Sequence, residues 1–273
     1  MLLKRLVTAA IGIPLFLAVL FTAPPAVFLI LILILFLIGT WEAIDLVFPQ
    51  GTIKEKLLLF AMAILLLYST LNGRLGEKTI ILIIVGLCTF GFISSRTKPI
   101  QEVVDRLGRA LLLTLYTGIL FALPAKIWLD PFGKGWVLLL FMGTWAADSG
   151  AYVAGRIWGK HKLLPVVSPG KTLEGVYGGI VVAVIVVFGS GSILANRGLL
   201  PPLPGWQRIV LGIAFGLFGV GGDLFESLLK RSAGKKDSGA LFPGHGGVLD
   251  RFDALLFNGV LVWVLMRSRE SWM

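Results

Sequence analysis

The chain has 273 residues, of which 56% are hydrophobic and only 15% are charged, and its mean hydropathy is +0.90. This composition excludes an ordinary soluble globular domain and predicts an integral membrane protein. The net charge of +10 does not indicate a nucleic-acid partner, because Lys and Arg also collect on cytoplasmic loops and beside anionic lipid headgroups.

Nine apolar runs are candidate transmembrane helices, because about 20 apolar residues cross the hydrocarbon core as a helix. They lie at residues 6–22, 26–47, 57–72, 79–94, 109–129, 135–155, 175–195, 207–229 and 252–267. The run PPLPG from Pro201 predicts a turn before the eighth. We expect one domain over residues 1–273, an all-α polytopic membrane protein with about nine transmembrane helices. Cys88 lies within an apolar run, so we expect a buried thiol.

Lys and Arg are distributed unequally between the two sides of this arrangement. The side that holds the N-terminus receives 17 of the 25, and the other side receives the remaining 8. The positive-inside rule therefore predicts a cytoplasmic N-terminus and an external C-terminus for a multi-pass protein of the cell (inner) membrane. Without the loops at 156–174 and 230–251, each side holds 8, so these two loops decide the orientation.

Carboxylates within or beside the predicted helices fall toward the predicted cytoplasmic side. A carboxylate in hydrocarbon costs several kcal/mol unless it is paired, hydrated or bound to a cation. The pattern predicts a polar cavity open to the cytoplasm. The acidic residues concerned are Glu42, Asp45, Asp148, Asp223, Glu226, Asp250 and Asp253.

The helices expected at 207–229 and 252–267 carry the densest polar cluster. A spacing of four places Glu226 beside Lys230. A spacing of three places Asp250 and Asp253 on one face of the following helix. Carboxylates from two facing helices, without a His or Cys cluster, suit a hard cation such as Mg²⁺. The alternative for any single Asp is an ion pair with a neighbouring Arg or a helix cap. The metal-ligand candidates are Asp223 and Asp250, followed by Asp253 and Asp148.

The loop between these two helices contains FPGHGG, residues 242–247. Glycines on both sides of His245 let backbone N–H groups approach an anion, and the next helix directs its N-terminus toward the same space. Because Asp250 and Asp253 would repel a phosphate there, a bridging metal is expected. The alternative for His245 is an ordinary hydrogen-bonded loop histidine.

A second polar segment, residues 148–175, ends in SPGKTLEG. Its GKT is not part of a P-loop, because Pro165 stands where that motif requires Gly and no apolar strand precedes it. Ser168, Lys171 and Thr172 stand just before the helix expected at 175–195, where a helix N-terminus and a Lys bind phosphate. An N-cap by Ser168 or Thr172 is compatible with this role.

The segment SLLKRSAGKKDSGALFPGHGGVLDRFD, residues 227–253, resembles the signature of the phosphatidate cytidylyltransferases. The upstream D-S-G-A-Y and S-P-G-K-T-x-E-G elements are also similar to this family, with Gly170 where a Lys is more common. The resemblance covers residues 145–260, which we expect to carry the catalytic motifs. It implies transfer of CMP from CTP to phosphatidic acid, giving CDP-diacylglycerol and pyrophosphate, with Mg²⁺ required and a second cation left open.

Residue chemistry and the resemblance together give a site prediction. The lipid phosphate would attack the α-phosphorus of CTP directly, because a phosphate monoester is mostly dianionic near neutral pH and needs no protein nucleophile. Catalytic candidates are Asp223, Lys230, Arg231, Asp250, Arg251 and Asp253. Substrate-binding candidates are Ser168, Lys171, Thr172, Lys236, His245, Gly246 and Gly247.

Two other functions are weighed against this one. A CTP-dependent lipid kinase would send the γ-phosphate to a lipid alcohol and would release CDP. An ion or phosphate transporter would carry its polar groups at the membrane midplane, often in inverted repeats, whereas here they crowd one end. The glycines Gly143, Gly150 and Gly155 permit close helix packing within or between subunits, which leaves a homodimer open.

Overall fold

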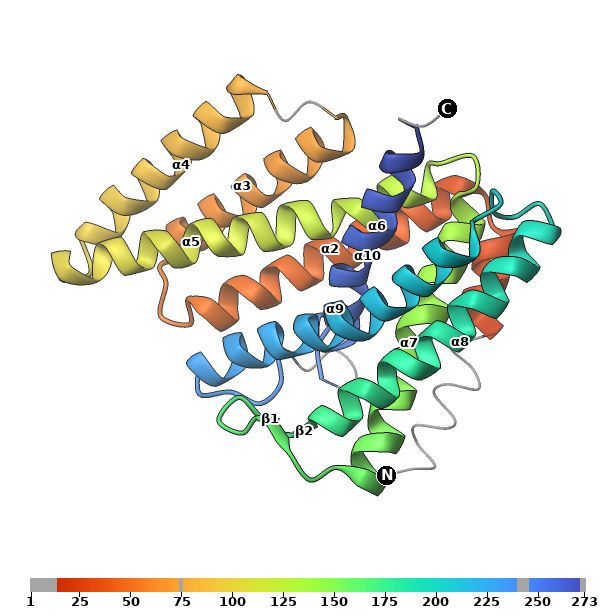
Figure 1. Cartoon of the computed structure of the whole chain (residues 1–273). Helices are drawn as coiled ribbons and strands as arrows, with labels where there is room; N and C mark the ends of the chain where they lie inside the picture. The colour runs from red at the N-terminus through yellow and green to blue at the C-terminus, as the bar shows by residue number, and fades with distance from the viewer. Residues whose placement is uncertain (1–13, 74–75, 240–245, 271–273) are drawn as a thin grey trace.

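The computed structural model describes residues 14–73, 76–239 and 246–270 (Figure 1). Its helices are α2 Pro25–Val47, α3 Ile53–Leu71, α4 Glu77–Ser95, α5 Ile100–Leu120, α6 Ala122–Trp128, α7 Gly133–Trp158, α8 Leu173–Asn196, α9 Gly205–Ser232 and α10 Leu249–Glu270. Two short strands, β1 Lys162–Leu164 and β2 Ser168–Thr172, lie between α7 and α8.

The all-α, polytopic class predicted from the sequence is confirmed. Among the described residues, six segments are long and apolar enough to cross a membrane, namely α2, α4, α5 with α6, α7, α8 and α9. Two further predicted runs form α3 and α10, and the run at 6–22 is helical at 14–22, where it is described. The membrane class is therefore shown, and the number of nine spans stays a prediction.

The start of α5 differs most from the predicted apolar run, which began at residue 109. The helix begins at Ile100, directly after Pro99, and its first turns include Arg106, whose charge is paired inside the fold. Arg106 Nη2 lies 2.7 Å from Oε1 of the fully buried Glu55, and its guanidinium stacks over the Phe48 ring at 5.1 Å. A buried charge of this kind is stable only when it is paired.

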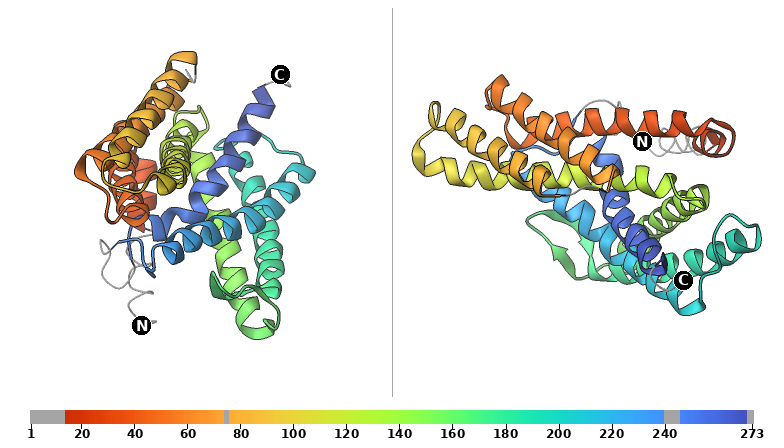
Figure 2. Two further views of the ribbon diagram at one scale, coloured as in Figure 1. Left: turned by 90° about the vertical axis from the view of Figure 1, so that its left-hand side faces the viewer. Right: turned by 90° about the horizontal axis from the view of Figure 1, so that it is seen from above.

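Two groups of helices form the molecule (Figure 2). Helices α3, α4 and α5 pack together on one side, and α7, α8 and α9 pack together on the other. Helix α10 joins the groups, because its Phe252 packs against the buried core of both. The residue Cys88 lies exposed on α4, so the expectation of a buried thiol was wrong. In a membrane protein an apolar helix can direct such a side chain outward.

Small residues bring α7 close to α8 and α9. A Cβ at Gly150 would lie 2.6 Å from the carbonyl oxygen of Gly178, and one at Gly143 would lie 2.7 Å from the Phe215 ring. Both distances are too short for any larger residue, so these two glycines serve packing within the subunit.

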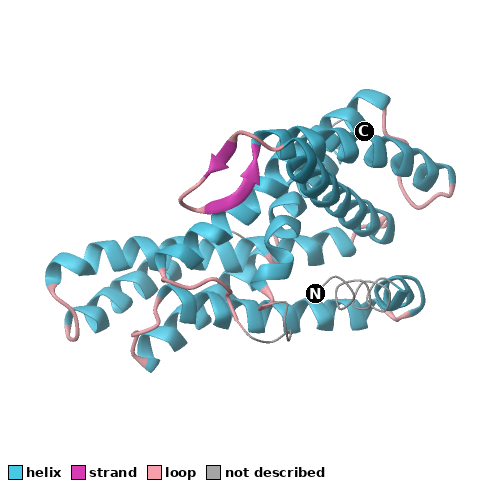
Figure 3. Cartoon of the chain, turned by 90° about the horizontal axis from the view of Figure 1, so that it is seen from below, coloured by secondary structure: helices cyan, strands magenta, loops and turns pink. Residues whose placement is uncertain are grey.

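A two-stranded antiparallel hairpin interrupts the helical pattern (Figure 3). Its register pairs Lys162 with Thr172 and Leu164 with Ser168. The hairpin was not anticipated, because SPGKT carries neither β-branched alternation nor a compact turn signal. It stands at the end of the molecule where α7 and α9 end and where α8 and α10 begin (Figure 1).

Candidate active site

A cavity of about 630 Å³ opens at this end, between α7, α8, α9, α10 and the hairpin. Its polar side chains come from α7, β2, α9 and α10, and α8 contributes Gly175 and Val176, so residues that are distant in sequence share one space. The polar residues that line it are Asp148, Tyr152, Arg156, Ser168, Lys171, Thr172, Asp223, Glu226, Lys230, Asp250 and Asp253.

Three carboxylates meet in this cavity. Asp223, Glu226 and Asp253 each offer one oxygen, and these oxygens lie within 4.8 Å of one another. Asp223 and Glu226 come from adjacent turns of α9, and Asp253 faces them from the first turns of α10. Like charges this close repel each other unless a cation lies between them or beside them.

Glu226 is the most buried member of this group, with no exposed surface. Its Oε2 lies 2.5 Å from Lys230 Nζ on the same helix, as the spacing of four predicted. Its Oε1 is buried and has no hydrogen-bond partner among the described residues. A buried carboxylate oxygen without a partner is costly, and a bound cation would satisfy it.

Asp250 occupies a different position from the other carboxylates. Its Oδ1 lies 2.6 Å from Lys230 Nζ, and its Oδ2 accepts hydrogen bonds of 2.8 Å each from the Ser238 backbone and hydroxyl and from the Gly247 backbone. Glu42 of α2 accepts hydrogen bonds from the Ser238 hydroxyl at 3.3 Å and from the Leu249 backbone at 3.2 Å. Together these acceptors connect Ser238, in the loop after α9, to Gly247 and Leu249 at the start of α10.

Lys171 extends into the cavity from β2. Its Nζ lies 2.6 Å from Asp223 Oδ2 and donates to the Val220 carbonyl at 3.3 Å. Thr172 caps α8, because its hydroxyl accepts from the Gly175 backbone at 3.1 Å, which confirms the predicted cap. Ser168 begins β2 and also lines the cavity. The structure thus brings the three residues of the SPGKT segment to the acidic group.

Other predicted site residues lie outside the cavity lining. Arg231 is exposed, and its Nε donates to the Val167 carbonyl at 3.3 Å, which joins α9 to the hairpin. Lys236 and Arg251 are exposed near the cavity end of the molecule. His245 lies outside the described residues. Gly246 has a φ of +82°, and Gly247 donates its backbone N–H to Asp250.

Several cavity residues were missed as site candidates by the sequence analysis. Glu226 was noted among the carboxylates of the predicted cavity and as a partner for Lys230, but not as a metal ligand, although its spacing of three from Asp223 places both on one helix face. Tyr152 and Arg156 belong to the same face of α7 as Asp148, at successive spacings of four, and line the cavity with it. Each could have been found by extending the helical spacing from an Asp already chosen.

The lining contains five carboxylates and three cationic side chains, so the positive charges balance the negative ones only in part. The cations are Arg156, Lys171 and Lys230. An excess of negative charge with an unpartnered buried oxygen fits a divalent cation with oxygen ligands. The residues present are therefore suitable for a metal ion.

The sequence of this chain is similar to that of known proteins. The sequence matches the cytidylyltransferase family over residues 3–269. The chain belongs to this family. The matched region includes every cavity residue, so the acidic group and the hairpin are parts of a cytidylyltransferase-family chain.

Three relatives are each named phosphatidate cytidylyltransferase. The Bacillus subtilis protein is 35% identical over 218 residues, which cover 80% of this chain and 70% of its own length. The Haemophilus influenzae protein is 46% identical over 132 residues, or 46% of this chain and 44% of its own. The Staphylococcus epidermidis protein is 42% identical over 134 residues, or 49% and 50%. The match therefore spans about half the length of the last two relatives.

Proposed function

We propose that this protein is a phosphatidate cytidylyltransferase, which transfers CMP from CTP to phosphatidic acid and yields CDP-diacylglycerol and pyrophosphate. The observation that carries the proposal is the cavity, where carboxylates and lysines meet at the end of apolar helices. Such a cavity accepts a charged nucleotide and a membrane lipid at one place. Membership of the cytidylyltransferase family supports CTP as the nucleotide, and the names of the relatives support phosphatidic acid.

The reaction is a single displacement at phosphorus. A lipid phosphate oxygen attacks the α-phosphorus of CTP, and the bond from that phosphorus to the oxygen that bridges to the β-phosphorus breaks. Pyrophosphate leaves with the electron pair of that bond. A phosphate monoester is mostly dianionic near neutral pH, so the attacking oxygen needs no general base. The task of the protein is to bring two anions together and to orient them.

Cationic side chains of the cavity perform this positioning. Lys171 and Lys230 hold their ammonium groups against carboxylates at 2.6 and 2.5 Å, so both groups are fixed in direction before substrate binds. Arg156 offers a planar set of donors on the α7 side, which suits two oxygens of one phosphate. These three residues would bind phosphate oxygens of CTP and of the lipid.

A metal ion is part of the proposal. Asp223, Glu226 and Asp253 would hold Mg²⁺, and Asp148 lines the same cavity from α7. When bound, this ion would neutralise phosphate charge and stabilise the charge that develops on the leaving pyrophosphate. Asp250 is assigned to Lys230 and to the loop by its four short contacts.

The orientation is also proposed. The cavity, the hairpin and the α9–α10 loop occupy one end of the molecule, and this end holds the Lys and Arg residues that decided the charge count. We place this end and the N-terminus in the cytoplasm, where CTP is available, and the C-terminus outside. A membrane-impermeant maleimide would test this with single cysteines in a Cys88→Ser background.

The function is tested with purified full-length protein, phosphatidic acid, Mg²⁺ and CTP labelled separately at the α- and γ-phosphorus. We expect α-label in the lipid and γ-label in pyrophosphate. Asp223→Asn should abolish the transfer, and the matched control Asp105→Asn, an exposed residue paired with Arg109 on α5, should keep it. Transfer of γ-label to an added lipid alcohol would instead support a lipid kinase, and no transfer by a folded protein would refute the proposal.

A further inference from the structure

The tip of the β1–β2 hairpin exposes apolar side chains outside the membrane-spanning helices. Val166 is 91% exposed and Leu164 is 45% exposed, and Trp158 at the end of α7 is 63% exposed. Exposed apolar groups on the lipid-facing sides of spanning helices are expected in a membrane protein. The hairpin is different, because it begins after one candidate span and ends before the next.

Chain connectivity places the hairpin at the membrane boundary. The candidate span of α7 ends at Trp158 and that of α8 begins at Leu173, so both ends of the hairpin segment lie at an interface. The exposed basic residues Lys160 and Lys162 lie at the base of the same hairpin, where Lys162 pairs with Thr172. Apolar and basic side chains on one exposed element are typical of segments that lie in the headgroup region of anionic membranes.

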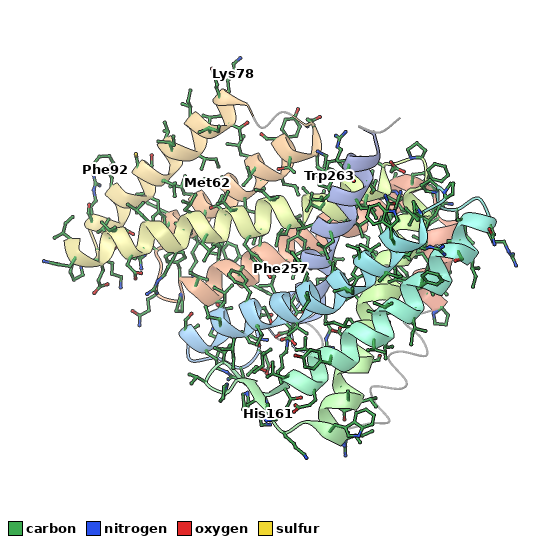
Figure 4. All side chains as sticks on the ribbon, viewed as in Figure 1. Met62, Lys78, Phe92, His161, Phe257 and Trp263 are labelled. Atoms are coloured by element: carbon green, nitrogen blue, oxygen red, sulfur yellow. The ribbon has the colours of Figure 1, made fainter. Side chains whose placement is uncertain are left out.

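The base of the hairpin is fixed to the helices. His161 Nδ1 lies 2.6 Å from Glu174 Oε1, and the Leu173 backbone donates to the His161 carbonyl at 2.9 Å. Figure 4 shows His161 at the edge of the molecule. At the end of the turn, Arg231 of α9 donates to the carbonyl of Val167, the residue before β2. With both sides held, the tip keeps a defined place relative to the helices.

The same hairpin forms a wall of the cavity. Ser168, Gly170 and Lys171 of β2 line it, whereas Leu164 and Val166 do not. One face of a short element therefore reaches the cavity, and its tip points to the surroundings. A lipid headgroup that contacts the tip would be beside the entrance to the cavity.

We propose that the hairpin tip, residues 164–167, inserts into the headgroup region of an anionic lipid surface next to the cavity. Because Lys160 and Lys162 are positively charged, we expect the hairpin to contact anionic lipid headgroups. If the proposed function holds, the inserted tip lies on the side from which the phosphate of phosphatidic acid enters the cavity.

Insertion is measured with a fluorescent bimane attached at single cysteines in a Cys88→Ser background. Val166→Cys tests the tip. Gln50→Cys, an exposed position of the α2–α3 loop, is the aqueous control, and Val85→Cys, which is 54% exposed at the middle of α4, is the hydrocarbon control. Vesicles contain phosphatidylglycerol and phosphatidylcholine with a nitroxide lipid at headgroup depth, and iodide is the aqueous quencher.

We expect nitroxide to quench the probe at position 166 about twofold more than the probe at position 50, and iodide to quench it correspondingly less. Lys160→Gln with Lys162→Gln should reduce nitroxide quenching in vesicles with phosphatidylglycerol, but not in vesicles of phosphatidylcholine alone. Equal iodide access at positions 166 and 50 would overturn the proposal. Protection from both quenchers would also overturn it, because it would indicate contact with protein, such as a second copy of the chain.

A kinetic measurement separates this inference from the proposed function. Leu164→Ser with Val166→Ser should raise the KM for vesicle-embedded phosphatidic acid severalfold and leave the kcat for a dispersed short-chain phosphatidic acid unchanged. An unchanged KM would contradict the role in lipid entry. If the wild-type protein transfers no CMP, the proposed function fails, while the quenching result still decides whether the tip inserts.

Discussion

Asp250 and Asp253 lie three residues apart, yet their side chains make different contacts. The Asp250 side chain is 9% exposed and Lys230 is 11% exposed, and their ionic contact of 2.6 Å is joined by three hydrogen bonds from Ser238 and Gly247. Asp253 accepts one hydrogen bond, from the adjacent Ala254 backbone, and belongs to the acidic group. Asp250→Asn should therefore affect folding, and Asp253→Asn should affect metal binding.

The magnitude follows from the contacts. Removing one partner of a buried, hydrogen-bonded ion pair costs about 3–5 kcal/mol. Lys230 retains Glu226 at 2.5 Å, so we expect a loss of about 3 kcal/mol in the free energy of unfolding, near the lower limit of that range. Asp253→Asn removes a negative charge from a repulsive group, and should leave the metal-free stability unchanged or raise it. The Mg²⁺ affinity of the Asp253→Asn variant should fall by more than about tenfold.

Both variants are assayed by denaturant unfolding in detergent, first with EDTA and then over a Mg²⁺ titration. Stabilisation by Mg²⁺ reports its affinity for the folded state. If Asp250→Asn left the EDTA stability intact and weakened Mg²⁺ binding as much as Asp253→Asn, Asp250 would be a metal ligand and the division proposed here would be wrong.

Three further substitutions test separate parts of the structure. Lys171→Met should lower kcat/KM for CTP by about a hundredfold or more. Lys54→Met, at an exposed position, should leave kcat/KM unchanged. Equal activity of the two variants would show that Lys171 does not bind phosphate. Gly150→Leu should lower the unfolding temperature, because its Cβ would lie 2.6 Å from a carbonyl oxygen of α8, and an unchanged temperature would contradict the close packing. Arg106→Met should lower the free energy of unfolding by about 3–5 kcal/mol, because it leaves the buried Glu55 without its cation. Adding Glu55→Gln should restore most of this stability. If the double variant stayed as unstable as Arg106→Met, the ion pair would not be the cause of the loss.

The sequence predicted the helices well where one local property decides them. Apolar runs bounded by Pro or Gly gave α2, α7, α8 and α9 within a few residues, because length and hydropathy suffice to define a span. The first turns of α5 were not predicted, because Arg106 is paired with Glu55, which lies on another helix. A rule that ends a span at a charge cannot detect a charge that is paired inside the fold.

The site was predictable to the extent that helical spacing decides it. Asp223, Asp253, Lys171 and Lys230 were chosen from spacing and from the family resemblance, and they share one cavity. The contact from Glu42 to Ser238 joins residues 196 positions apart, and no local pattern indicates it. The hydrogen bonds of Asp250 could not be predicted either, because their donors come from the loop that follows α9.

The central claim is that CMP passes directly from CTP to a lipid phosphate in this cavity. The most direct measurement uses CTP with sulfur in place of one α-phosphorus oxygen, in a single configuration, and determines the configuration in the lipid product. A single displacement predicts CDP-diacylglycerol with inverted configuration at phosphorus. Retention would show two displacements through a nucleotidylated protein, and it would contradict this account, as would the absence of the product.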